Sequence, residues 1–93
     1  MENTLRIRYA YDLGLMDGIA DILTTMYETG EYEDYNLVKP VYDEWCRSLE
    51  SVEKNPLNDC GHRLSLDLYE WLYSLDVIEL DELPYELRKL EEM

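Results

Sequence analysis

Apolar side chains recur at helical spacing along most of this sequence, and this periodicity limits the fold more than any other feature. Residues 15–27 place apolar side chains every three or four positions, and residues 38–54 do the same around Trp45. Gly30 follows the first run and Asn55-Pro56 follows the second, as expected where helices end. We therefore predict helices over 15–29 and 38–54, with Pro40 in the first turn of the second. The apolar positions are Leu15, Met16, Ile19, Ile22, Leu23, Met26 and Tyr27, then Val38, Val41, Tyr42, Trp45, Leu49 and Val52.

The rest of the chain predicts two more helices and leaves one segment ambiguous. Residues 63–75 form a third amphipathic run after a loop, and Asp81 is placed to cap a short last helix, with Pro84 in its first turn. Residues 4–12 alternate as a strand would, yet they also continue a helical stripe, and we favour helix because a lone strand has no clear partner. The prediction is all-α: a single domain over 1–93, a compact small helical bundle of three main helices plus a short C-terminal helix. The apolar positions of the last two helices are Leu64, Leu68, Trp71, Leu72 and Leu75, then Leu83, Leu87 and Leu90.

Negative charge dominates the composition and is unevenly distributed. The chain has 22 acidic and 8 basic residues, for a net charge of −14. Residues 9–38 and 64–87 contain no Lys or Arg and hold seven carboxylates each, so these two segments account for the whole net charge. A helix that needs only solubility usually mixes its signs and gains ion pairs between neighbouring turns. Such a protein repels nucleic acid and anionic membranes and is attracted to basic surfaces.

Candidate contact residues follow from these two segments. Asp17 and Asp21 are one helical turn apart and Glu28 lies two turns beyond, with rises of about 6 Å and 10 Å along one outward face. Such a row can offer a basic groove a charge pattern similar to that of phosphates, although a solvated helix face has the same spacing. Tyr32 and Tyr35 lie in a polar stretch where no core is expected, whereas Tyr42, Tyr69 and both tryptophans are expected in the core. The candidate partner-binding residues are Asp17, Asp21, Glu28, Glu31, Tyr32, Glu33, Asp34, Tyr35, Asp67, Glu70, Asp76, Glu79, Asp81 and Glu82.

Catalytic and metal-binding patterns are not recognisable. Cys46 and Cys60 are too few for a disulfide framework, and we expect free thiols. With His62 they match no common zinc spacing, and the carboxylates of EYEDY do not form a calcium loop. We therefore expect no metal, no cofactor and no enzymatic activity. The chain shows neither an apolar signal core near its start nor a long apolar run, so we expect a cytoplasmic protein with no membrane partner.

The two basic-free segments and the stretch EYEDY give the chain the character of a known class. It resembles the very small, acidic, often helical inhibitors that phages and other mobile elements carry against host restriction or CRISPR nucleases. Many members of that class present carboxylates in place of DNA or RNA phosphates. The resemblance implies a non-catalytic inhibitor whose partner is a nuclease or effector complex with a basic nucleic-acid-binding groove; the class shares no motif, so no functional residue is transferred from it. The alternative is a small acidic helical adaptor or assembly subunit that binds a protein through an apolar patch.

Overall fold

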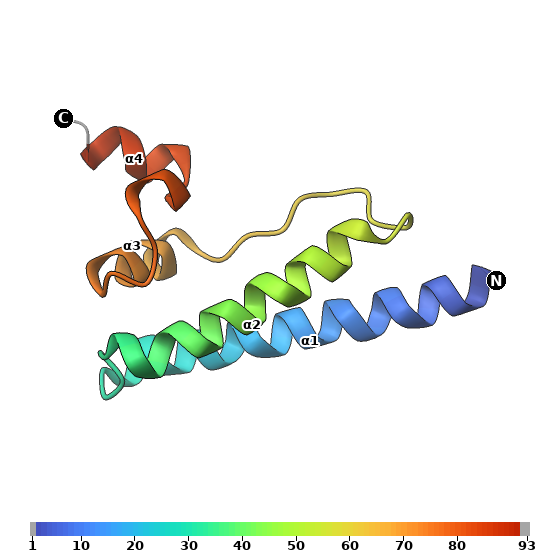
Figure 1. Cartoon of the computed structure of the whole chain (residues 1–93), viewed down its shortest axis with the longest axis horizontal. Helices are drawn as coiled ribbons and strands as arrows, with labels where there is room; N and C mark the ends of the chain where they lie inside the picture. The colour runs from blue at the N-terminus through green and yellow to red at the C-terminus, as the bar shows by residue number, and fades with distance from the viewer. Residues whose placement is uncertain (1, 92–93) are drawn as a thin grey trace.

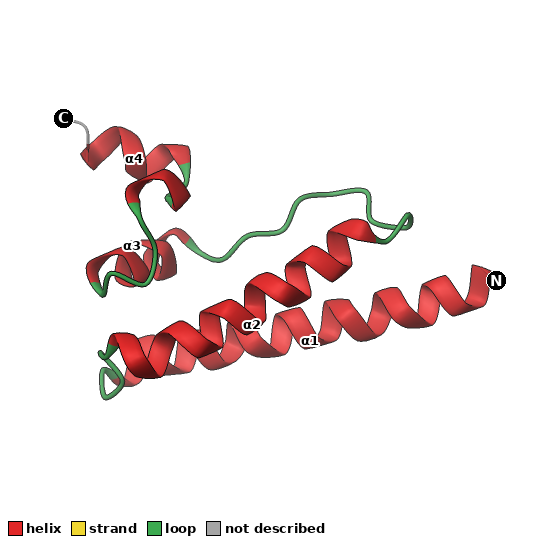
Figure 2. Cartoon of the chain, viewed as in Figure 1, coloured by secondary structure: helices red, strands yellow, loops and turns green. Residues whose placement is uncertain are grey.

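The computed structural model describes residues 2–91 and shows a bundle of helices (Figure 1). The α-helices are α1 (Glu2–Thr29), α2 (Tyr35–Lys54), α3 (Leu66–Ser74) and α4 (Tyr85–Glu91), and a 3-10 turn, η1 (Leu80–Glu82), precedes α4. Figure 2 shows no strand in this described part of the chain. The predicted all-α bundle of three main helices and a short C-terminal helix is therefore confirmed.

α1 is one continuous helix that joins the run predicted over 15–29 to the ambiguous residues 4–12. Two hydrogen bonds join the first third of α1 to the residues that follow α2. The Tyr9 hydroxyl donates to Asn58 Oδ1 at 3.1 Å, and Asn55 Nδ2 donates to the Leu5 carbonyl at 3.2 Å. These contacts explain why residues 4–12 are helical, as predicted. The buried side of α1 repeats every three or four residues, at Asp12, Met16, Ile19, Leu23 and Met26.

α2 runs antiparallel to α1 and packs along it (Figure 1). It begins at Tyr35, three residues before the predicted start, because the Asp34 carboxylate caps it by accepting a hydrogen bond from the Asn36 N–H at 2.8 Å. Pro40 therefore lies inside the helix, and the expectation that it occupies the first turn is wrong. The buried residues of α2 also recur every three or four positions, at Val38, Tyr42, Trp45, Ser48 and Val52.

A long loop, residues 55–65, returns from the end of α2 to α3 (Figure 1). α3 begins three residues later than predicted, because Ser65 Oγ caps it by accepting from the Leu68 N–H at 3.3 Å. Leu64 is buried, but it belongs to the loop, where its N–H donates to the Tyr69 hydroxyl at 3.2 Å. The loop thus contributes to the core on which α3 rests.

The predicted cap of the last helix is wrong. Glu79 precedes η1, and its N–H donates to Glu82 Oε2 at 3.1 Å. Asp81 lies inside this turn and so cannot cap the helix that follows.

α4 begins at Tyr85, directly after Pro84, so this proline precedes the helix and the prediction that placed it in the first turn is wrong. Leu83 is buried and Leu87 packs against the core, as predicted. The side chain of Leu90 lies outside the described part of the structure. Arg63 of the long loop and Glu86 of α4 form two hydrogen bonds, at 3.3 and 2.7 Å, which tie α4 to the loop.

The core lies where α1, α2 and α3 meet. Leu23, Val38 and Leu72, one from each helix, are fully buried. All four aromatic residues predicted to be core are buried, namely Tyr42, Trp45, Tyr69 and Trp71. The molecule measures 48 × 30 × 17 Å, with the α1–α2 hairpin along its long axis (Figure 1). Within residues 2–91, no helix combines the length and the apolar character needed to cross a membrane.

Candidate acidic binding surface

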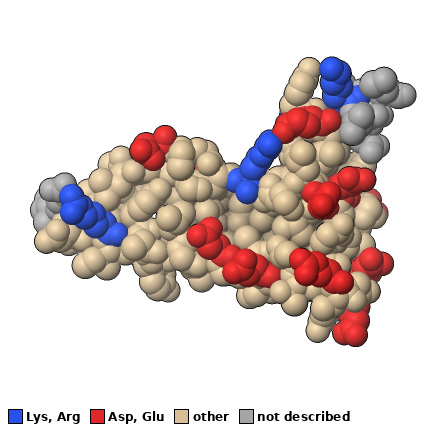
Figure 3. All heavy atoms as spheres, turned by 180° about the vertical axis from the view of Figure 1, so that it is seen from behind, with Lys and Arg blue, Asp and Glu red and all other residues tan. Residues whose placement is uncertain are grey.

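The first group of predicted contact residues lies on the side of α1 that faces away from the core. Asp17, Asp21 and Glu28 are all exposed. With a rotation of 100° per residue, their mean direction lies about 160° around the α1 axis from the mean direction of the buried α1 residues. Figure 3 shows carboxylates gathered on one face of the molecule, over the half away from the N-terminal end of α1. These three carboxylates, which we call the α1 stripe, therefore point away from the core into solvent.

The second group lies in the turn between α1 and α2. Gly30 ends α1 with a φ of 68°, a conformation that glycine adopts without strain. Residues 31–35 are all exposed, and the Asp34 N–H donates to the Tyr32 carbonyl at 2.8 Å. The Asp34 carboxylate also caps α2, so one predicted contact residue has a structural role as well.

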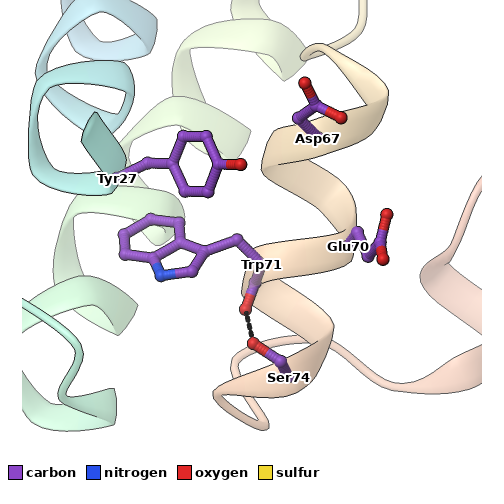
Figure 4. A pocket seen from close by; sticks show the side chains of 5 residues that line it. All are labelled: Tyr27, Asp67, Glu70, Trp71 and Ser74. Carbon is purple, nitrogen blue, oxygen red and sulfur yellow. Dashed lines mark hydrogen bonds between the residues drawn. The ribbon is translucent and has the colours of Figure 1, made fainter. Parts of the chain in front are cut away.

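α3 brings the second acidic segment against α1. The rings of Tyr27 and Trp71 lie with their centroids 5.5 Å apart and their planes at 57°. Together with Asp67, Glu70 and Ser74 they line a cavity of about 250 Å³ (Figure 4). The acidic pair of α3 thus lines a cavity bordered by Tyr27, which directly precedes Glu28 in α1. We call the α1 stripe, the 31–35 turn and this cavity the acidic face.

The six predicted contact carboxylates of residues 64–87 form the predicted second row. Two of them line the cavity, and the other four lie around the connection between α3 and α4. All four are exposed. One of them, Glu82, acts electrostatically on Lys39 of α2; the pKa of Lys39 is raised chiefly by its hydrogen bond to Asp43, and the charge of Glu82 adds to this rise. The predicted second row is thus divided between the acidic face and a separate group, which consists of Asp76, Glu79, Asp81 and Glu82.

The ion pairs of the described structure lie outside the predicted contact residues. Of the fourteen carboxylates in the two basic-free segments, Asp12 pairs with Arg8 and Glu86 pairs with Arg63. The remaining twelve are the predicted contact carboxylates, and within residues 2–91 none of them forms an ion pair. The acidic residues of α2 behave differently, because each of three basic residues pairs with an acid one turn away: Lys39 with Asp43, Arg47 with Glu44, and Lys54 with Glu50. Within the two basic-free segments, unpaired negative charge therefore coincides with the predicted contact residues; elsewhere in residues 2–91, Glu53 and Asp59 also form no ion pair.

The two thiols are free and lie apart. Cys46 is partly buried on α2, and burial raises the pKa of its thiol. Cys60 Sγ lies 3.7 Å from His62 Nε2, but the same nitrogen lies 3.0 Å from Asn58 Oδ1. A nitrogen that donates to the Asn58 oxygen cannot also accept the thiol proton, so this pair lacks the arrangement of a nucleophile and its base. No group of three or more His, Cys, Asp or Glu residues in the described chain is arranged to hold a metal ion.

Helical spacing alone does not identify the aromatic part of the acidic face. It assigns Tyr27 and Trp71 to apolar helix faces, and Trp71 is indeed 7% exposed, whereas Tyr27 is 38% exposed. Trp71 Nε1 is buried, and no hydrogen-bond partner for it is found in the described structure. The two rings meet only because α3 docks on α1, and no pattern within one segment signals this contact.

Comparison with known proteins gives no precedent for this arrangement. No family model, no curated protein and no solved structure matches the chain. Its function is therefore inferred from the charge, exposure and geometry of its own residues.

Proposed function

We propose that this protein is a non-catalytic inhibitor that docks on the basic nucleic-acid-binding groove of a host defence nuclease, in the manner of anti-restriction or anti-CRISPR proteins. The observation that carries the proposal is the set of twelve exposed carboxylates without an ion pair in residues 2–91. Within residues 2–91, Arg8, Lys39, Arg47, Lys54 and Arg63 pair with acids outside this set. Repulsion within the unpaired set is relieved when external cations approach, and a groove rich in Lys and Arg supplies them.

The cavity between α1 and α3 fits a basic side chain of such a partner. Tyr27 and Trp71 offer aromatic surface, and Asp67 and Glu70 offer carboxylates at the same cavity (Figure 4). A guanidinium or ammonium group is attracted both to ring faces and to carboxylates. Tyr32 and Tyr35, which are 40% and 44% exposed, add rings beside the carboxylates of the turn.

The test is DNA cleavage by purified restriction and RNA-guided nucleases, with and without this protein and with a short competitor duplex. The face variant combines Asp17→Asn, Glu28→Gln and Glu70→Gln. The matched control, called the ion-pair control, combines Asp43→Asn, Glu50→Gln and Glu86→Gln, which removes the same formal charge from ion-paired positions. The parent and the control should inhibit cleavage in competition with DNA. The face variant should inhibit at least tenfold less, mainly through slower association that depends less steeply on salt.

The adaptor alternative gives different results in the same assay. An adaptor that binds through an apolar patch binds equally at low and high salt, and nucleic acid does not displace it. Equal inhibition or equal binding by the face variant and the ion-pair control would show that the acidic face is only a solvated surface.

A further inference from the structure

A second surface lies on the other flank of α1, where α1 and α2 leave a groove lined mainly by apolar side chains. Two adjoining cavities of about 490 and 410 Å³ share Ile22 of α1 and Val41 of α2. Leu15 and Ile19 extend the lining toward the start of α1, and Met26 and Tyr32 extend it toward the turn between the helices. We call this surface the apolar groove.

The apolar groove is open to solvent. Leu15 is 45% exposed, Ile22 is 52% exposed and Tyr32 is 40% exposed. Contiguous exposed apolar side chains of this kind mark interaction sites on small proteins. From Leu15 to Met26 the groove follows α1 for about 16 Å, or three helical turns. A strip of this length between two antiparallel helices matches the apolar face of a third helix.

Carboxylates surround the apolar groove, and their negative charge determines which kind of partner helix can bind there. Asp21 of α1 and Glu44 of α2 line the two cavities, and Glu31 and Glu33 flank Tyr32 at the turn. A second copy of this chain, itself carrying a net charge of −14, would bring like charges together at this rim. A cationic helix would place its Lys and Arg side chains against the same carboxylates.

We propose that the apolar groove binds a basic amphipathic helix of a partner protein. Apolar side chains at positions i, i+4, i+7 and i+11 of that helix lie along Ile19, Ile22 and Val41, and its basic side chains point toward the carboxylate rim. The groove and its rim share Asp21, Glu31, Tyr32 and Glu33 with the acidic face. The apolar lining itself lies mostly outside that face, so this proposal stands whether or not the acidic face mimics nucleic acid.

The probe is a two-heptad peptide of leucine and lysine with leucines at helical spacing, compared with a scrambled peptide of the same composition. Binding is measured by fluorescence anisotropy and mapped by amide chemical shifts. The amphipathic peptide should bind the parent at least tenfold more tightly than the scrambled peptide does. The shifted amides should lie in residues 15–26 and 37–44.

The decisive variant is Ile22→Ser, and its matched control is Ile7→Ser. Both isoleucines lie on α1 and are exposed, at 52% and 71%, so neither change should unfold the protein. Loss of one apolar side chain from the contact should weaken peptide binding about tenfold for Ile22→Ser. Ile7→Ser should stay within about twofold of the parent, because Ile7 lies outside the groove.

Three results would overturn the proposal. Equal binding of the scrambled peptide would mean that charge alone attracts the probe. Shifts confined to the cavity around Trp71 would assign the peptide to the acidic face. A parent protein that sediments as a dimer, and becomes a monomer with Ile22→Ser, would identify a second copy as the occupant. Nuclease inhibition by Ile22→Ser is a separate readout, so failure of this proposal and failure of the proposed function can be distinguished.

Discussion

Two hydrogen bonds hold the first third of α1 to the loop after α2, and removing them should open this third before the rest of the protein. Tyr9→Phe removes the hydroxyl that donates to Asn58 Oδ1. Asn55→Asp removes the amide that donates to the Leu5 carbonyl, while it keeps an oxygen for the Leu57 N–H. A net hydrogen bond contributes about 1 kcal/mol, and Asn55→Asp also places a carboxylate at a buried position, so the double variant should lose at least about 2 kcal/mol locally. That loss corresponds to an increase of about thirtyfold in the local opening equilibrium.

Native-state hydrogen exchange measures this opening residue by residue. Amides of residues 8–12 should exchange about thirtyfold faster in the double variant, because each 1.4 kcal/mol changes the opening equilibrium tenfold. Amides of residues 19–26, which lie beside the fully buried Leu23, should change little. Asn3→Asp adds the same charge at an exposed position and serves as the control. Unchanged exchange in residues 8–12, or an equal rise in both regions, would refute the idea that these two bonds anchor a separately opening segment.

Three further predictions concern stability, each measured as the midpoint of urea unfolding. Leu23→Ala should lower the free energy of unfolding by about 3 kcal/mol, because the fully buried side chain leaves a cavity, and a loss under about 1 kcal/mol would contradict this. Asp34→Ala should cost about 1 kcal/mol through loss of the α2 cap, whereas Asp34→Asn should be nearly neutral because asparagine caps equally well; equal losses would argue against capping. Burial raises the pKa of the phenols of Tyr42 and Tyr69, so stability should be full below about pH 10 and should fall as the pH rises further, and a midpoint constant up to pH 11 would exclude this linkage.

The buried positions of α1 and α2 could be predicted from the sequence, because the spacing of apolar residues depends only on the geometry of each helix. Met16, Leu23 and Val38 all follow spacing that one helix imposes on its own residues, and all three are buried. The helix starts are predicted less well, since the periodic apolar run alone marks the beginning of α2 and α3 too late or too early. α2 and α3 begin instead after Asp34 and Ser65, whose side chains accept backbone hydrogen bonds. Both caps are visible in the sequence, so greater weight on polar capping residues gives the observed starts.

The candidate site could be predicted only in part. The exposure of the predicted contact carboxylates follows from charge and helical spacing, and the structure confirms that exposure. The contact between Tyr27 and Trp71 depends on how α3 docks, and the openness of Leu15 and Ile22 depends on which flank of α1 the other helices cover. Both are tertiary facts without a local signal.

The uneven distribution of charge along the molecule should also orient it as it approaches a basic partner. Along its 48 Å length, Arg6, Arg8 and Lys54 lie toward the start of α1, and the unpaired carboxylates lie toward the other end (Figure 3). A body whose charge is off-centre experiences a torque near a basic surface and turns its acidic end forward before contact. The start of α1 then trails away from the partner. A fluorophore attached at Ile7, which is 71% exposed, should therefore report on encounter without obstructing it.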